Sequence, residues 1–240
     1  MNIFGNTSTE VLGFTGVEPH IANAEEYNLG NLMYDHSKGM ITESIVSLNI
    51  EKELKILELG VCGTRHLPVV FKQAPGLQYF GLDTSQRRID EVTNVNNTVI
   101  AGYQAFFFPY NGLHVPYADH SFDRILTVNT IYFWQNPNTF LKELYRVLRP
   151  NGICVITFME GTFMKNLSFI NDSFQLYDIA RFVHILVESG FENADIRTRN
   201  ECVQNKKGDV ADKVFLVATL QKVSKEDTHT KRKEYYTITN

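Results

Sequence analysis

The sequence predicts an α/β fold: a doubly wound, seven-stranded, mostly parallel sheet that carries helices on both faces and ends in a C-terminal antiparallel hairpin. Two observations predict this fold. Five apolar strand patterns alternate with amphipathic helical patterns between about residue 54 and about residue 189, as expected for a parallel sheet. Two more strand patterns, 191–199 and 213–220, are joined by a polar loop, as expected for a hairpin at the sheet edge.

Each element follows from a local pattern of residues. The five parallel strands are expected at 54–59, 77–83, 103–110, 122–129 and 153–159. The helices between them show apolar residues at helical intervals and end at glycine or proline. The first helix begins near Pro68, a second covers 85–101, a third begins at Pro137, and a fourth covers 174–189 and stops at Gly190.

The chain divides into three parts. Residues 1–50 are expected to form an irregular arm followed by cap helices, because apolar residues recur at helical intervals only after about residue 23. Residues 51–221 are expected to form one ligand-binding domain, and 222–240 a mobile polar tail. The cluster Lys231-Arg232-Lys233 in this tail is interpreted as a solvated patch.

The composition excludes several classes of protein. The chain has 240 residues, 43% of them hydrophobic, and a formal net charge of −4, which does not favour binding to nucleic acid. It contains no run of about 18 apolar residues that would span a membrane, and its first residues do not resemble a signal peptide. Cys62, Cys154 and Cys202 are too scattered for a disulfide framework or a metal site, so a cytoplasmic location is expected.

The stretch around which the chain is organised is the turn that follows the first strand. Glu58 ends an apolar run, and Gly60 and Gly63 follow within five positions, which indicates a strand, a tight turn and the start of a helix. A dinucleotide site would need glycine at positions 62 and 65, where the chain has Cys62 and Arg65. An acidic residue inside the turn suits a cationic amino-acid ligand better than a pyrophosphate.

This turn resembles motif I of the class I S-adenosylmethionine-dependent methyltransferases, which is written Glu/Asp-x-Gly-x-Gly-x-Gly. Glu58 and Gly60 match the motif, whereas Cys62 and Thr64 stand where its second and third glycines belong. Gly63 is displaced by one position. The family has a Rossmann-like fold, and its motif I surrounds the amino-acid end of the cofactor S-adenosyl-L-methionine.

The rest of the chain extends this resemblance. Asp83 follows the second strand, where the family has an acidic residue that binds the ribose hydroxyls. Asn111 stands where the family has an aspartate that contacts the adenine amine, although counting along the strand selects Tyr110 instead. The segment 141–152 closely matches the family's helix and turn before strand 5. The resemblance covers about residues 40–220 and is greatest for small-molecule enzymes of the ubiquinone and menaquinone methyltransferase type.

The resemblance assigns a set of residues to the two ligands. Those expected to bind S-adenosyl-L-methionine are Glu58, Gly60, Cys62, Gly63, Asp83, Thr84, Asn111, Gly112, Leu113 and Asn129. Those expected to bind the acceptor are Tyr34, His36, Tyr132 and Trp134, whereas Phe133 is expected in the core. Methyl transfer from a sulfonium is an in-line displacement that depends mainly on alignment. The sequence therefore names no catalytic residue and implies no metal.

Three functions compete at this point. The preferred one is methyl transfer to a small-molecule acceptor, and the apolar residues of the 160–173 loop favour an apolar or aromatic acceptor. The second is a non-catalytic binding protein of the same fold, favoured by Cys62, Thr64 and Arg65 in the turn. The third is a nicotinamide-dependent oxidoreductase, against which the glycine spacing counts. The sequence does not indicate the oligomeric state.

Overall fold

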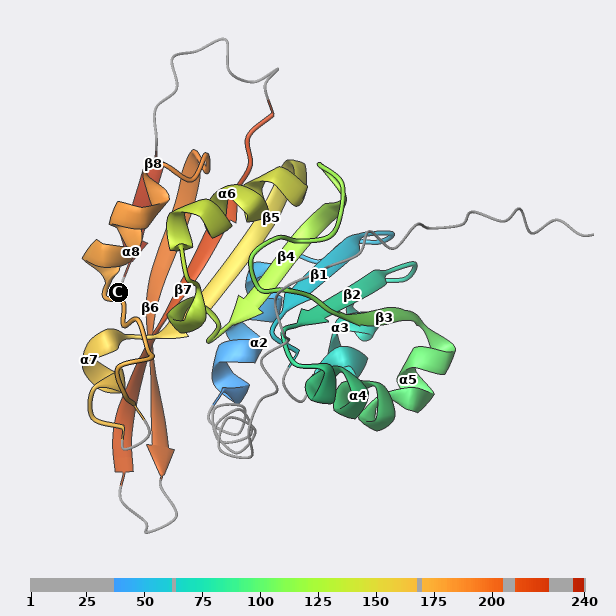
Figure 1. Ribbon diagram of the computed structural model, residues 1–240, viewed down its shortest axis with the longest axis horizontal. Coiled ribbons are helices and arrows are strands. Elements are labelled where there is room, and N and C mark those ends of the chain that lie inside the picture. Colours follow the sequence, from blue (N-terminus) through green and yellow to red (C-terminus); the bar gives the residue numbers. More distant parts are fainter. Residues whose placement is uncertain (1–36, 62–63, 168–169, 205–209, 225–234, 240) are drawn as a thin grey trace, which may run out of the picture.

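The sheet at the centre of the protein has eight strands. The computed structural model describes residues 37–61, 64–167, 170–204, 210–224 and 235–239. The strands lie in the order β3-β2-β1-β4-β5-β7-β6-β8 (Figure 1). The first five pair in parallel, β7 is antiparallel to both β5 and β6, and β8 is parallel to β6. Their bounds are β1 Lys55–Leu59, β2 Gln78–Asp83, β3 Gln104–Pro109, β4 Phe122–Val128, β5 Leu148–Met159, β6 Asn193–Gln204, β7 Val210–Gln221 and β8 Tyr235–Thr239.

Helices cover both faces of this sheet. Successive side chains of a strand point to opposite faces, so Ile56 and Leu57 of β1 belong to different layers. Ile56 packs in a cluster with α2 and α3, and Leu57 packs in the main core with α6 and α8. The helices are α2 Lys38–Ser47, α3 Leu67–Gln73, α4 Gln86–Val95, α5 Asn97–Gly102, the 3₁₀ turn η1 Ile131–Phe133, α6 Pro137–Val147, α7 Gly161–Met164 and α8 Ile179–Leu186.

The predicted α/β architecture, with a mostly parallel sheet and antiparallel strands at its C-terminal side, is confirmed, but the count of seven strands is wrong by one. The eighth strand, β8, lies in the segment that was expected to be a mobile polar tail. Its residues, Tyr-Tyr-Thr-Ile-Thr, are aromatic and β-branched, and such residues favour a strand when a partner edge is available. The exposed edge of β6 supplies this partner.

Two predicted helices are shorter than their sequence patterns suggest. The helix expected at 85–101 is divided into α4 and α5 at Asn96, whose side-chain amide donates to the Val92 carbonyl at 2.9 Å. The helix expected at 174–189 begins at Ile179, because the Asp178 side chain accepts the Arg181 amide at 2.7 Å and caps it there. Of the cap helices expected within residues 1–50, α2 lies in the described part of the chain.

The carboxyl ends of β1 to β4 meet at one edge of the sheet, because these strands are parallel. In such sheets ligands bind beyond this edge. The turns that follow Leu59, Asp83, Pro109 and Val128 are therefore neighbours, although they are far apart in the sequence. No helix within the described residues has the length and hydrophobicity that a membrane crossing requires.

A buried arginine of the sheet forms hydrogen bonds with the C-terminal end of α2. The Arg124 side chain of β4 is 7% exposed, and its Nε donates to the Leu48 carbonyl at 2.6 Å while Nη2 donates to the Asn49 carbonyl at 3.0 Å. The last carbonyls of a helix have no partner inside the helix, so this guanidinium satisfies groups that would otherwise be orphaned.

We expect Arg124→Met to lower the free energy of unfolding by about 2–3 kcal/mol, because it leaves the buried Leu48 carbonyl and the partly buried Asn49 carbonyl without a charged donor. Chemical denaturation followed by circular dichroism measures the change. Lys52→Met, at an exposed position before β1, is the matched control and should change the stability by less than about 0.5 kcal/mol. Equal stability of the two variants would contradict the capping role of Arg124.

Candidate functional site

The turn after β1 needs glycine at position 60 for two separate reasons. Gly60 has a φ of +81°, which side chains rarely tolerate, and a Cβ built there would lie 2.4 Å from Cγ2 of Thr130. Its amide donates to the Leu82 carbonyl at 2.8 Å. The turn therefore contacts the exits of both neighbouring strands, β2 and β4. Cys62 and Gly63, which the sequence also assigns to the cofactor, lie outside the described residues.

Asp83, the last residue of β2, joins this turn to the next one. Its Oδ2 accepts the Val61 amide at 3.1 Å and its Oδ1 accepts the Ser85 amide at 2.9 Å. The residue is 2% exposed, and burial raises its pKa, while Arg88 and the two amides act in the opposite direction. Each carboxylate oxygen retains a lone pair that can accept one more hydrogen bond.

The turn after β3 lies against the turn after β2. Gly112 has a φ of +75°, and a Cβ added there would lie 3.0 Å from Cγ2 of Thr84. The Asn111 side-chain oxygen accepts the amides of Leu113 and His114, both at 2.9 Å. The acceptor that the sequence assigns to adenine is thus already used to close the turn. Leu113 is 48% exposed. Tyr110, the alternative to Asn111 for the contact with adenine, donates its backbone amide to the Asp83 carbonyl at 3.0 Å.

Helix α6 holds the segment that follows this turn. The Glu143 carboxylate accepts the Val115 amide at 2.8 Å and pairs with His114 at 2.6 Å. The Arg146 guanidinium donates to the carbonyls of Tyr117 and Val115. Arg146 also lowers the pKa of Glu143 against the effect of burial, so the carboxylate stays charged. The segment between β3 and β4 is thus ordered by side chains of α6.

Asn129, directly after β4, is the centre of a buried polar network. It adopts a left-handed conformation with a φ of +58° and is 7% exposed. Its side-chain oxygen accepts the Tyr132 hydroxyl at 2.9 Å and the Met159 amide at 3.3 Å, and its amide donates to Ser37 Oγ at 2.9 Å. This network ties the ends of β4 and β5 to the start of α2. A role for Asn129 in cofactor binding remains a prediction.

The three aromatic residues after β4 point in different directions. Tyr132 is completely buried, and Trp134 is 5% exposed and donates from Nε1 to Thr130 Oγ1 at 3.2 Å. Phe133, which was expected in the core, is 49% exposed, so that expectation is wrong. The reason is the 3₁₀ turn η1, in which successive side chains are about 120° apart.

The predicted acceptor residues are therefore placed differently from one another. Tyr132 and Trp134 lie beneath the surface, and their contact with an acceptor remains a prediction. Phe133 packs on Phe174 with ring centroids 4.9 Å apart. Gln175 fixes this arrangement, because its amide donates to the Tyr132 carbonyl and its side chain donates to the Trp134 carbonyl, both at 3.0 Å. Tyr34 and His36 lie outside the described residues.

Two residues that contact Glu58 were not predicted from the sequence. The Tyr79 hydroxyl donates to Glu58 Oε2 at 2.8 Å, and His66 Nε2 lies 3.2 Å from Glu58 Oε1. Burial, followed by the charge of Glu58, raises the pKa of Tyr79 well above its usual value. His66 follows the glycine turn directly, and this position in the sequence could have indicated that it lies near Glu58. Tyr79 lies in the middle of a strand and carries no such signal.

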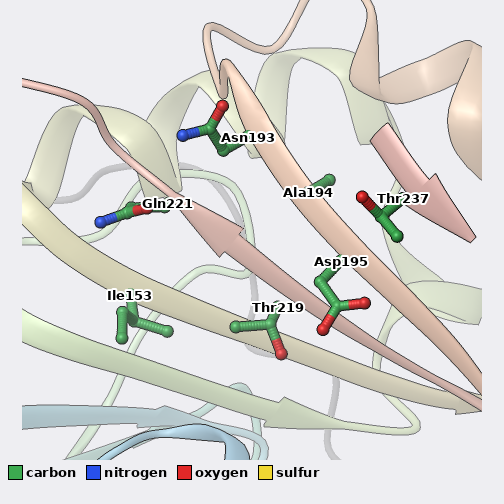
Figure 2. A pocket seen from close by; sticks show the side chains of 7 residues that line it. All are labelled: Ile153, Asn193, Ala194, Asp195, Thr219, Gln221 and Thr237. Atoms are coloured by element: carbon green, nitrogen blue, oxygen red, sulfur yellow. The ribbon is translucent and has the colours of Figure 1, made fainter. Parts of the chain in front are cut away.

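A hollow of about 450 Å³ lies away from this edge, at the opposite ends of the strands. Figure 2 shows its lining, which comes from β5, β6, β7 and β8. The lining residues are Ile153, Asn193, Ala194, Asp195, Thr219, Gln221 and Thr237. Asp195 pairs with Arg197 at 2.6 Å. The hollow contains none of the residues that gather at the carboxyl edge, so it is separate from the candidate site.

We expect Gly60→Ala to lower the free energy of unfolding by about 2–4 kcal/mol, because it combines a strained backbone with a steric clash against Thr130. Adding Thr130→Ser removes the clashing methyl group and should restore about 1 kcal/mol or more, with Thr130→Ser alone as the reference. Gly102→Ala is the control, because its Cβ would meet no atom within 4 Å. Denaturant titration measures all four variants, and a lack of coupling between positions 60 and 130 would refute the clash.

Comparison with known proteins agrees with this architecture. Residues 57–156, which run from β1 into β5, match the model of a methyltransferase domain family. The chain is 26% identical over 133 residues to the O-methyltransferase resE of Aspergillus sclerotiorum, covering 55% of this chain and 50% of that protein. It is also 26% identical over 126 residues to the demethylmenaquinone methyltransferase of a Geobacillus strain, covering 48% and 50% of the two chains. The aligned stretches thus span about half the length of these relatives.

Solved structures resemble the fold over more of the chain. The phosphoethanolamine N-methyltransferase 2 of Haemonchus contortus, solved with S-adenosylhomocysteine, superposes with a TM-score of 0.64 at 13% identity and covers 87% of this chain and 61% of that chain. At this identity the likeness shows the fold alone. Together, the methyltransferase domain matched over residues 57–156, the relatives in sequence and the shared fold support a class I S-adenosylmethionine-dependent methyltransferase.

Proposed function

We propose that this protein transfers a methyl group from S-adenosylmethionine to a small-molecule acceptor with an apolar or aromatic face. The observation that carries the proposal is the contact of Gly60 with Thr130. It brings the turn that resembles motif I against the exit of β4, three residues before the exposed ring of Phe133. This contact supports the proposal that the cofactor and an apolar acceptor bind side by side at one edge of the sheet.

The described residues fit the cofactor of the family. Gly60 and Gly112 have no side chains where the turns after β1 and β3 approach their neighbours. Asp83 is anchored by two amides and keeps a free lone pair on each oxygen, as binding of two ribose hydroxyls requires. Thr84, Gly112 and Leu113 lie at adjoining turns and are proposed to contact the adenosine. Glu58 is proposed to attract the ammonium group at the amino-acid end.

S-adenosylmethionine supplies an electrophilic methyl group on a sulfonium. The contribution of this chain is to bind both ligands and to align them, which can supply a large part of a rate enhancement. Phe133 and Phe174 are proposed to hold an apolar acceptor by packing against it. The described chain carries no assigned general base at this edge, so an acceptor atom that ionises by itself or carries a lone pair is favoured.

The competing function is a non-catalytic protein of the same fold, because a fold does not by itself determine an activity. The turn departs from the family at Cys62, Thr64 and Arg65. Thr64 is completely buried, and its hydroxyl donates to the Val61 carbonyl at 2.7 Å. This bond closes the turn with a side chain where the family has glycine, which supports a turn that is altered but still ordered.

The first measurement is calorimetric titration with S-adenosylmethionine and S-adenosylhomocysteine. We expect micromolar binding that Asp83→Ala weakens about tenfold or more, equivalent to about 1.4 kcal/mol, because the ribose hydroxyls lose their acceptor. Asp90→Ala, which removes an exposed acid of α4, is the control and should bind as the unmodified protein does. Absence of binding to the unmodified protein would favour the non-catalytic function.

The acceptor is tested with a panel of apolar, aromatic and purely polar compounds. We expect Phe133→Ala to raise the KM of apolar acceptors about tenfold, through loss of buried apolar contact, while the Kd of the cofactor stays unchanged. Phe133→Leu should restore most of the effect, and Phe106→Ala, another exposed phenylalanine on the edge strand β3, serves as the control. Faster turnover of polar than of apolar acceptors would exclude the proposed acceptor class.

A further inference from the structure

Three titratable side chains form a buried cluster beneath the turn after β1. Glu58 is 5% exposed, Tyr79 is completely buried and His66 is 8% exposed. The Tyr79 hydroxyl lies 2.8 Å from Glu58 Oε2, and His66 Nε2 lies 3.2 Å from both Glu58 Oε1 and the Tyr79 oxygen. Each group thus contacts the other two. The functional assignments above give no role to His66 or Tyr79.

The hydrogen bonds of this cluster determine which histidine nitrogen carries a hydrogen. The Tyr79 hydrogen is used on Glu58, so the tyrosine oxygen and the carboxylate both act as acceptors toward His66. His66 Nε2 must therefore be the donor, an assignment that follows from the network. The other nitrogen, Nδ1, is buried and has no hydrogen-bond partner among the residues that the structure describes. A buried polar atom without a partner is rare in folded proteins and calls for an explanation.

The charge of Glu58 depends on the state of His66. When the imidazole is neutral, Glu58 is a buried anion held by uncharged donors, of which Tyr79 and His66 are the two closest. The Thr64 hydroxyl lies 3.4 Å from Oε2 of the same carboxylate. When the imidazole takes up a proton, it forms an ion pair with Glu58 and cancels this charge. Among the described residues, Asp83 of β2 interacts electrostatically with this cluster, because burial and, to a lesser extent, the charge of Glu58 raise its pKa. Lys72, in the last turn of α3, is exposed. Arg65 precedes His66 in the chain.

Histidine is the member of this cluster that can change its charge near neutral pH. An imidazole ordinarily titrates between about pH 5 and pH 8. Tyr79 stays neutral across this range, because burial and the charge of Glu58 raise its pKa well above the usual value.

We propose that His66 is a positioning residue that sets the net charge at Glu58 and thereby makes the affinity for the amino-acid end of the cofactor depend on pH. This inference rests on the proposed function, in which Glu58 attracts the ammonium group of that end. Neutral His66 leaves Glu58 free to attract the ammonium, and protonated His66 both neutralises Glu58 and repels the ammonium. Affinity is therefore high above neutral pH and falls toward acid pH.

The experiment measures the Kd of three ligands between about pH 5.5 and about pH 8. S-adenosylmethionine and S-adenosylhomocysteine carry the amino-acid end, and 5′-methylthioadenosine lacks it. The variant His66→Gln keeps a donor near the position of Nε2 but does not titrate. Tyr79→Phe removes the other of the two closest donors to Glu58 and leaves His66 in place. The thermal unfolding midpoint of each variant is followed at every pH, so that loss of fold is recognised.

We expect the unmodified protein to bind both amino-acid-containing ligands about tenfold more weakly at the acid end, and 5′-methylthioadenosine equally well at all pH values. His66→Gln should bind all three ligands with the same affinity across the range. Tyr79→Phe should bind the first two more weakly at every pH and retain the pH dependence.

Two results would overturn the proposal. In one, His66→Gln keeps the pH dependence of the unmodified protein. In the other, 5′-methylthioadenosine shows the same dependence, which would locate the titrating group at the adenosine. If no ligand binds at any pH, the cofactor function itself fails, and the inference fails with it. Binding without pH dependence refutes the role of His66 and leaves the cofactor function intact.

Discussion

The turn after β1 depends on close contacts with the strands on both sides of it. The Val61 amide binds the Asp83 carboxylate, and Gly60 lies so close to Thr130 that a single added carbon would clash. These two contacts join the exits of β1, β2 and β4. Because parallel strands end at one edge, three turns that are distant in the sequence become one surface. The other features of the candidate site are arranged around this junction.

The altered glycine motif is explained by how the turn is closed. A glycine-rich turn lets the backbone approach a ligand, and replacing its glycines normally adds bulk there. Here Thr64 points into the protein, where it is completely buried and bonds to the Val61 carbonyl. Its side chain stabilises the turn from within. The departure from the family motif at this position is therefore compatible with an open binding surface.

The buried acid Glu58 shows how the same turn is supported from below. A carboxylate that is 5% exposed is stable as an anion when donors surround it, and Tyr79, His66 and Thr64 are these donors. At the exit of β4, the 3₁₀ turn and its hydrogen bonds to Gln175 hold Phe133 at the surface.

The sequence by itself determined the alternation of strands and helices and the resemblance to methyltransferases, because hydrophobic periodicity and the turn residues are local properties. It placed Glu58, Gly60, Asp83 and Asn111 at strand exits for the same reason.

Only the tertiary structure decided what these residues contact. Asn111 uses its oxygen within its own turn, and Phe133 is exposed while Tyr132 and Trp134 are buried. The pairing of β8 with β6 and the cluster of Glu58, Tyr79 and His66 join residues from separate segments. Such contacts depend on packing between elements, which no local pattern records.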